Sequence, residues 1–168
     1  MFRLRQWLQL LTKNESMILK GAQAPEFTLP DLNGKPVKSA DLHQDRPALL
    51  VFFKASCPVC QMTLPFLNRL LSKLSVVAIS QDDATVTQRF RARFGVTLPT
   101  LLDDEAFGYP VSNQYRITNV PSLFLVEPDG LISLAVAGFS KADLEAIAHR
   151  AGTEIFQATE SVPAWRPG

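Results

Sequence analysis

The feature that most constrains this chain of 168 residues is a buried-strand pattern that leads straight into a pair of cysteines. The run Ala48–Phe53 is apolar on both faces, which is typical of a central strand covered by helices. Cys57-Pro58-Val59-Cys60 follows it, contains both cysteines of the chain and opens a helical pattern. Two thiols at this spacing can interconvert between a dithiol and a disulfide. The pattern therefore predicts redox chemistry at the end of a central strand.

Two other interpretations of the cysteine pair stay open, an inert structural pair and half of a zinc site. Zinc sites in proteins normally take four ligands, and the other soft ligands, His43 and His149, lie far apart in the chain. Zinc is therefore disfavoured, and neither a metal nor another cofactor is expected. A net charge of +1 gives no electrostatic reason to expect nucleic acid as a partner.

Residues 1–20 form an N-terminal extension. The spacing within residues 1–13 predicts a short amphipathic helix with one apolar face, made of Leu4, Trp7, Leu8 and Leu11. This helix is expected to pack on the domain or on a second subunit of a homodimer, with weak contact to a membrane surface as the alternative. Polar residues break the apolar stretch, and Pro25 follows the nearest small-residue cleavage site. No cleaved signal peptide is expected, which favours a cytoplasmic location over a membrane-associated or periplasmic one.

The rest of the chain alternates predicted strands and helices. An Asn-Gly turn joins Phe27–Leu29 and Pro36–Lys38 into a hairpin. Further strands are expected at Val76–Ser80, Thr100–Leu102, Ser122–Val126 and Leu131–Ala137, and helices at Pro58–Leu74, Thr85–Phe94, Phe107–Tyr115 and Ser140–Arg150. We expect Pro65 to kink the first helix and Pro110 to interrupt the third. Residues 40–46 are expected to be a polar connection, and residues 153–168 an extended or loosely packed tail.

Several motifs within residues 21–152 occur together in one known superfamily. They are the opening segment Gly21–Phe27, the Asp31–Lys35 turn, the Cys-x-x-Cys with Pro65 after it, and Asn119–Leu125 before an Asp-Gly turn. The chain resembles the thioredoxin-like superfamily, nearest to the TlpA/ResA-type thiol-disulfide oxidoreductases and the related AhpC/TSA group. This resemblance implies an α/β, three-layer thioredoxin-like fold, with a central mixed sheet, helices on both faces and an N-terminal β-hairpin. The domain would span residues 21–152, between the extension 1–20 and the tail 153–168.

The resemblance also implies the roles of three residues. Cys57, at the positive end of a helix, would be the nucleophile that attacks a substrate disulfide. Cys60, one turn further on, would attack the mixed disulfide and release the reduced substrate. Pro121 would complete a cis peptide with Val120 that faces Cys57 and pairs with an extended substrate; Leu98-Pro99 is the rival position for the cis bond.

Three positions depart from the pattern of this family. Ser56 stands where these reductases usually carry a tryptophan beside the nucleophile. Thr63 occupies the position of a glutamate common in TlpA/ResA-type enzymes, and Val51 that of the buried aspartate of thioredoxin. Both usual proton acceptors for the second cysteine are therefore missing.

Three charged residues are candidate modulators of the cysteine pair. Asp82 and Asp83 follow a parallel strand, so they should emerge at the same sheet edge as Cys57. Either carboxylate could then accept the proton of Cys60. Water could serve instead, and the two aspartates could simply lie in a solvated loop that caps the next helix. Lys54 ends the central strand, where its charge could favour the Cys57 thiolate or point into solvent.

Three functions remain to be separated. The first is a thiol-disulfide oxidoreductase, expected to reduce protein or small-molecule disulfides with electrons from a thiol donor. The second is a peroxiredoxin-type peroxidase that reduces hydroperoxides. Against it, Lys54 stands where peroxiredoxins carry Thr or Ser, and Cys60 is unusually near for a resolving cysteine. The third is a non-enzymatic binding module that keeps the fold.

Overall fold

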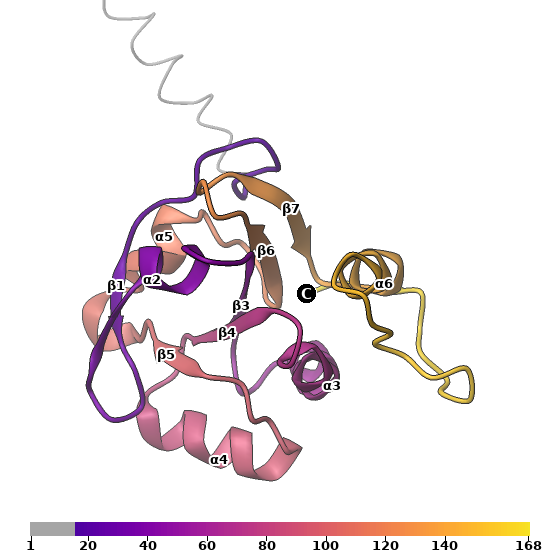
Figure 1. The fold of residues 1–168 in the computed structure, drawn as a ribbon. Helices are drawn as coiled ribbons and strands as arrows, with labels where there is room; N and C mark the ends of the chain where they lie inside the picture. Colours follow the sequence, from indigo (N-terminus) through magenta and orange to yellow (C-terminus); the bar gives the residue numbers. More distant parts are fainter. Residues whose placement is uncertain (1–15) are drawn as a thin grey trace, which may run out of the picture.

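A five-stranded mixed sheet runs through the centre of the molecule (Figure 1). The computed structural model describes residues 16–168, and the strand order is β5-β4-β3-β6-β7. The strands are β3 (Ala48–Phe53), β4 (Ser75–Ser80), β5 (Thr100–Leu102), β6 (Ser122–Val126) and β7 (Ile132–Ala137). β3 pairs parallel with β4 and antiparallel with β6, while β5 extends the parallel part and β7 the antiparallel part. The strand that leads to the cysteines is thus the central one, and all its residues are buried.

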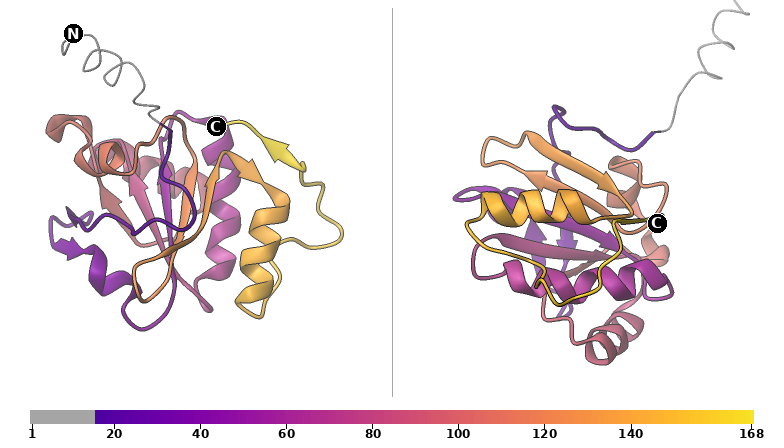
Figure 2. Two further views of the ribbon diagram at one scale, coloured as in Figure 1. Left: turned by 90° about the horizontal axis from the view of Figure 1, so that it is seen from above. Right: turned by 90° about the vertical axis from the view of Figure 1, so that its right-hand side faces the viewer.

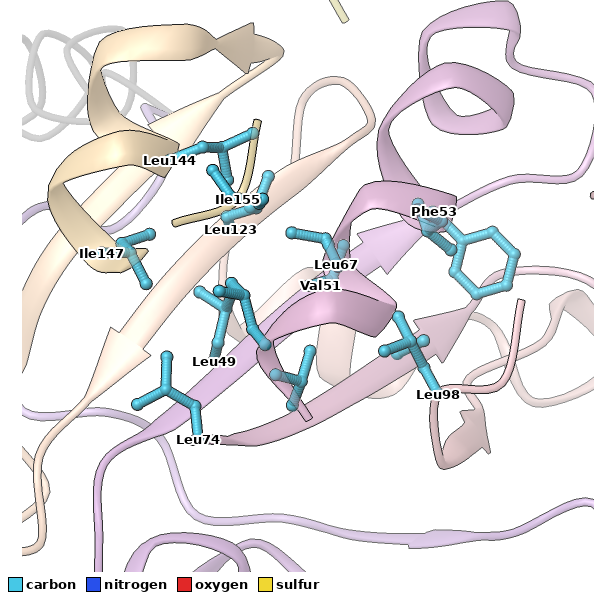
Figure 3. Packing of buried hydrophobic residues seen from close by; sticks show 14 of the residues in the cluster. Leu49, Val51, Phe53, Leu67, Leu74, Leu98, Leu123, Leu144, Ile147 and Ile155 are labelled. Atoms are coloured by element: carbon cyan, nitrogen blue, oxygen red, sulfur yellow. The ribbon is translucent and has the colours of Figure 1, made fainter. Parts of the chain in front are cut away.

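Alternate residues of β3 serve two hydrophobic clusters, one on each face of the sheet. The first face is covered by α3 (Pro58–Leu67), α4 (Ala84–Phe94) and α6 (Lys141–Arg150). Figure 3 shows this packing, in which Leu49 and Val51 of β3 lie near Leu67 of α3 and Ile147 of α6. Because strand side chains alternate between faces, this one strand links both halves of the core.

The second face is covered by shorter elements. They are α2 (Ser39–His43), α5 (Pro110–Gln114) and the hairpin of β1 (Thr28–Pro30) and β2 (Pro36–Lys38). The ring of Tyr115, which is fully buried, packs against Phe52 and Phe124 with centroid distances of 5.1 and 4.9 Å. Helices on both faces and an N-terminal hairpin confirm the predicted three-layer architecture.

Several predicted helix boundaries were wrong. Residues 40–46 are not simply a connection, because α2 forms where Ser39 exchanges hydrogen bonds with the backbone of Phe27. Pro110 begins α5 rather than interrupting a helix, since the first helical position needs no N–H donor. The helix after the cysteines ends at Leu67 and is followed by a 3-10 turn at Asn68–Leu70. The Asn68 side chain bonds the loop after α4, at Gly95 and Thr97.

Residues 155–160 are packed on the domain, so this part of the tail is not loosely packed as one alternative had it, whereas residues 164–168 are exposed and include a short strand. Ile155 is buried, and Phe156 packs against the first-face cluster. Arg69 donates to the Ile155 carbonyl oxygen at 2.7 Å and forms a two-pronged ion pair with Glu160. Further on, β9 (Trp165–Arg166) pairs antiparallel with β8 (Phe139–Ser140). Apolar burial and one guanidinium hold this segment against α3 and α6.

The predictions for residues 1–13 lie outside the described residues, and the domain boundaries and the cellular location stay predictions. Within residues 16–168, no helix has the length and apolar character needed to cross a membrane.

The Arg69–Glu160 pair predicts a pH-dependent anchor for the tail. Glu160 accepts hydrogen bonds from the Arg69 side chain and from the Gln157 N–H, and these lower its pKa from 4.5 to about 2, with the larger effect from Arg69. A carboxylate with a lowered pKa stabilises the folded segment above its ordinary pKa, and this contribution is lost as the pH falls from 4.5 towards 2. The Gln157 amide signal in NMR spectra should therefore titrate with a midpoint near pH 2.

Replacing Arg69→Gln should raise this midpoint towards 4.5. The matched control is Arg150→Gln, which removes the comparable ion pair with Glu127 and should leave the Gln157 signal unchanged. A midpoint near 4.5 in the unmodified protein would contradict the prediction.

Candidate functional site

The site lies where β3 ends and α3 begins. Cys57 is the N-cap of α3, with extended backbone angles of φ −83° and ψ 116°, and Pro58 occupies the first helical position. Proline suits this position because its fixed φ is helical and its missing N–H would have no partner in the helix. The Cys57 N–H bonds back to the Lys54 carbonyl at 3.2 Å and closes the turn out of the strand. Strand, turn and proline together fix the first cysteine at a helix N-terminus.

The Cys57 sulfur is half-buried and has two polar neighbours. It accepts a hydrogen bond from the Cys60 N–H at 3.2 Å, and its thiol donates to the Val120 carbonyl oxygen at 3.3 Å. Backbone N–H groups and the helix dipole stabilise negative charge at this end of a helix. The Cys57 sulfur is thus partly exposed at a position that favours negative charge. Ser56 beside it is exposed and leaves this side of the sulfur without a bulky cover.

Cys60 has the opposite environment. Its side chain is fully buried, and burial is the main cause that raises the pKa of its thiol far above the ordinary value. The hydrogen bond with Cys57 raises it further, the backbone of Lys54 lowers it, and the negative charges of Cys57 and Asp82 add smaller increases. Cys60 therefore stays protonated until a nearby group takes its proton.

The loop before β6 completes the wall around Cys57. Val120-Pro121 is a cis peptide, as predicted, and is the one cis bond within residues 16–168, so the rival Leu98-Pro99 is trans. Pro121 is buried, and its carbonyl oxygen accepts the Gly138 N–H at 2.7 Å. The Val120 carbonyl faces the Cys57 thiol. The sequence motif thus places this loop beside Cys57.

The two aspartates after β4 do different things. Because β3 and β4 pair in parallel with Phe53 opposite Ser80, Asp82 emerges beside the loop that carries Cys57. Its carboxylate accepts the Ala55 N–H at 2.7 Å, and its charge contributes to the raised pKa of Cys60. Asp83 instead caps α4 by accepting the Val86 N–H at 2.8 Å. The capping interpretation holds for Asp83, whereas Asp82 faces the cysteine site.

Lys54 is half-buried beside the ring of Tyr109 rather than pointing freely into solvent, and its effect on the Cys57 thiolate stays a prediction. Its ammonium nitrogen lies 5.8 Å from the centre of the Tyr109 ring. There it lines a shallow cavity together with the acidic side chains of Asp82, Asp83, Asp104 and Glu105. A cation over an aromatic face and among carboxylates is stabilised by both. Lys54 and Asp82 therefore line the same cavity next to the loop that carries Cys57.

The remaining departures from the family pattern are also accounted for. The Thr63 hydroxyl is buried and donates to the Val59 carbonyl oxygen at 2.6 Å, and Val51 packs in the core. Neither can accept a proton from Cys60. Gln61, which the sequence did not single out, donates to the Ala55 carbonyl oxygen at 2.9 Å and braces the loop before Cys57. Within residues 16–168, no three His, Cys, Asp or Glu side chains gather as metal ligands would.

Comparisons with known proteins agree with this geometry. The model of the AhpC/TSA family matches residues 20–135. The thiol-disulfide oxidoreductase ResA of Geobacillus kaustophilus is 25% identical over 138 residues, which cover 78% of this chain and 77% of that protein. The thioredoxin-like protein YneN of Bacillus subtilis is 26% identical over 146 residues, or 82% and 83% of the two chains.

Solved structures share the fold. The thioredoxin domain of a thiol-disulfide oxidoreductase from Bacteroides vulgatus matches with a TM-score of 0.68 at 22% identity, over 79% of this chain and 97% of that one. This likeness concerns the fold alone.

The contrast between the two thiols predicts selective alkylation. In the reduced protein, iodoacetamide should modify Cys57 and leave Cys60 unmodified, because Cys60 is fully buried and its raised pKa keeps it protonated. Mass spectrometry of the digested protein measures both. In Cys57→Ser protein, the fraction of Cys60 that iodoacetamide modifies should stay at the background measured without the reagent. Comparable labelling of both cysteines would contradict the asymmetry.

Proposed function

The chain belongs to the AhpC/TSA family, and on that premise we propose that it is a thiol-disulfide oxidoreductase that reduces protein disulfides through Cys57 and Cys60. One observation carries the proposal: a half-exposed sulfur at a helix N-terminus accepts the N–H of a second, fully buried cysteine. The pair combines a reachable nucleophile with a protected thiol one turn away. The relatives named thiol-disulfide oxidoreductases support the same chemistry.

The first step forms a mixed disulfide. The Cys57 thiolate attacks one sulfur of the substrate disulfide, the substrate S–S bond breaks, and the departing sulfur leaves as a thiolate that takes a proton. The Cys60 N–H and the start of α3 stabilise the attacking charge. The Val120 backbone lies where a substrate segment would pass alongside the sulfur.

The second step releases the substrate. The Cys60 sulfur attacks Cys57, forms the intramolecular disulfide and expels the second substrate thiolate, so that the substrate gains two electrons and two protons. Cys60 must first lose its proton, and we assign its removal to the Asp82 carboxylate. The Ala55 N–H orients that carboxylate beside the loop that carries Cys57. A thiol donor then returns the pair to the dithiol form.

Insulin reduction with dithiothreitol as the electron source tests the proposal. Cys57→Ser should reduce the rate to the uncatalysed background, because no nucleophile remains. Cys60→Ser should instead accumulate a mixed disulfide at Cys57, which mass spectrometry detects. A parallel peroxide-consumption assay examines the peroxidase alternative, and the unmodified protein should there match Cys57→Ser. Rapid peroxide turnover with slow insulin reduction would contradict the proposal, and activity in neither assay would leave a binding module.

The role of Asp82 has a separate test with the chromogenic disulfide DTNB, which releases one coloured thiolate in each step. Asp82→Asn keeps an oxygen for the Ala55 N–H but removes the charge. The first release should be unchanged, and the second should slow by roughly 10²-fold, the usual contribution of a general base. Asp83→Asn is the matched control, since asparagine also caps helices well, and both steps should keep their rates.

The opposite result would identify a purely electrostatic role. The Asp82 charge raises the pKa of Cys60, so removing it alone would produce more thiolate and speed the second release. An unchanged or faster second step in Asp82→Asn would therefore contradict proton removal by this carboxylate.

A further inference from the structure

Residues 165–168, here called the C-terminal strap, end against the loop that faces Cys57. The strap begins with β9, whose pairing to β8 continues the bond from the Lys141 N–H to the Ala164 carbonyl oxygen. It then reaches Asn119 and Val120. A methyl group built on Gly168 would lie 2.7 Å from the Val120 carbonyl oxygen and 2.6 Å from the Asn119 amide nitrogen. Gly168 is thus in close contact with the backbone beside Pro121.

A second glycine makes the other side of this contact. A methyl group on Gly138 would lie 2.5 Å from the Arg166 carbonyl oxygen and 3.0 Å from the Gly168 nitrogen. Its φ of +81° also favours glycine. The strap therefore passes between Gly138 and the Asn119-Val120 backbone, where side chains at either glycine would exclude it. This close fit distinguishes the strap from a chain end that merely rests on a surface.

The strap and Cys57 share one carbonyl group. The Val120 oxygen that Gly168 approaches is also the acceptor of the Cys57 thiol, at 3.3 Å. Figure 2 shows the C-terminus at the end of the molecule where α3 begins. A substrate segment that paired with the Val120 carbonyl would therefore meet the strap. We propose that the strap is an internal occupant of the substrate groove, which a protein substrate must displace.

The way in which the strap is held allows it to move. Its ladder with β8 involves only two residue pairs, and both residues of β9 are exposed, with Trp165 at 57%. The preceding part of the tail is anchored by buried Ile155 and by Arg69. Local opening is easiest where few apolar contacts must be lost. We therefore expect the strap to open locally while Ile155 and Glu160 stay anchored on the domain.

A Gly138→Ala variant of the chain of residues 1–168 tests this role. Its methyl group would meet backbone atoms of the strap and push it away from Val120. Gly34→Ala is the matched control, because Gly34 has the same φ of +81° with no atom within 4 Å of the added methyl. Gly138→Ala should raise the rate of Cys57 alkylation by iodoacetamide, and of insulin reduction, several-fold over both the unmodified protein and the control.

Because the proposed role rests on the proposed function, alkylation serves as the readout that needs no substrate. Faster alkylation without insulin reduction in any variant would support the strap and overturn the proposed function. If Cys57 in Gly138→Ala is alkylated no faster than in Gly34→Ala, the proposed role of the strap is wrong, whatever the insulin assay gives.

A second variant keeps the test decisive if Gly138→Ala does not fold, as judged by circular dichroism. Gly168→Val leaves the bond from the Gly138 N–H to Pro121 untouched and places atoms against the Val120 carbonyl. It should raise the same two rates. Unchanged alkylation in Gly168→Val would then overturn the proposal.

Discussion

The hydrogen bond from the Cys60 N–H to the Cys57 sulfur is the interaction on which the rest of the site depends. It exists because Cys57 caps α3 from an extended conformation, and that conformation follows from the turn out of the buried strand β3. The same bond holds the Cys57 sulfur against the first turn of α3 and supplies a donor to negative charge on that sulfur. A helix cap, which elsewhere only ends a helix, is here the centre of the redox chemistry.

Burial then separates the two cysteines into different roles. The Cys57 sulfur stays half-exposed at the end of the sheet, while Cys60 points into the cluster formed by β3, α3 and α4. The apolar surroundings that stabilise the fold are the same ones that raise the pKa of the Cys60 thiol. In the proposed mechanism, the core therefore keeps the Cys60 thiol inactive until its proton is removed.

The sequence predicted those features that local patterns determine, and it failed where distant contacts decide. The strand β3 and the start of a helix at the cysteine pair follow from runs of adjoining residues, and the cis bond at Pro121 was implied by the family resemblance. The helix α2 forms because Ser39 bonds the distant Phe27, and the tail is held by Arg69. Asp82 and Asp83 are adjacent and identical residues, so the local sequence pattern could not show that their side chains point in different directions.

The loop position of the proposed proton acceptor has a mechanical consequence. A carboxylate on β3 or on α3 would be fixed by regular secondary structure, whereas Asp82 is oriented by one bond from Ala55. Ala55 belongs to the turn that carries Cys57, and Gln61 of α3 holds the same residue through its carbonyl oxygen. Acceptor, turn and helix are therefore linked through one backbone unit. A movement of the turn on substrate binding would shift the carboxylate with it, and in the proposed mechanism this would couple proton removal from Cys60 to the geometry of the mixed disulfide.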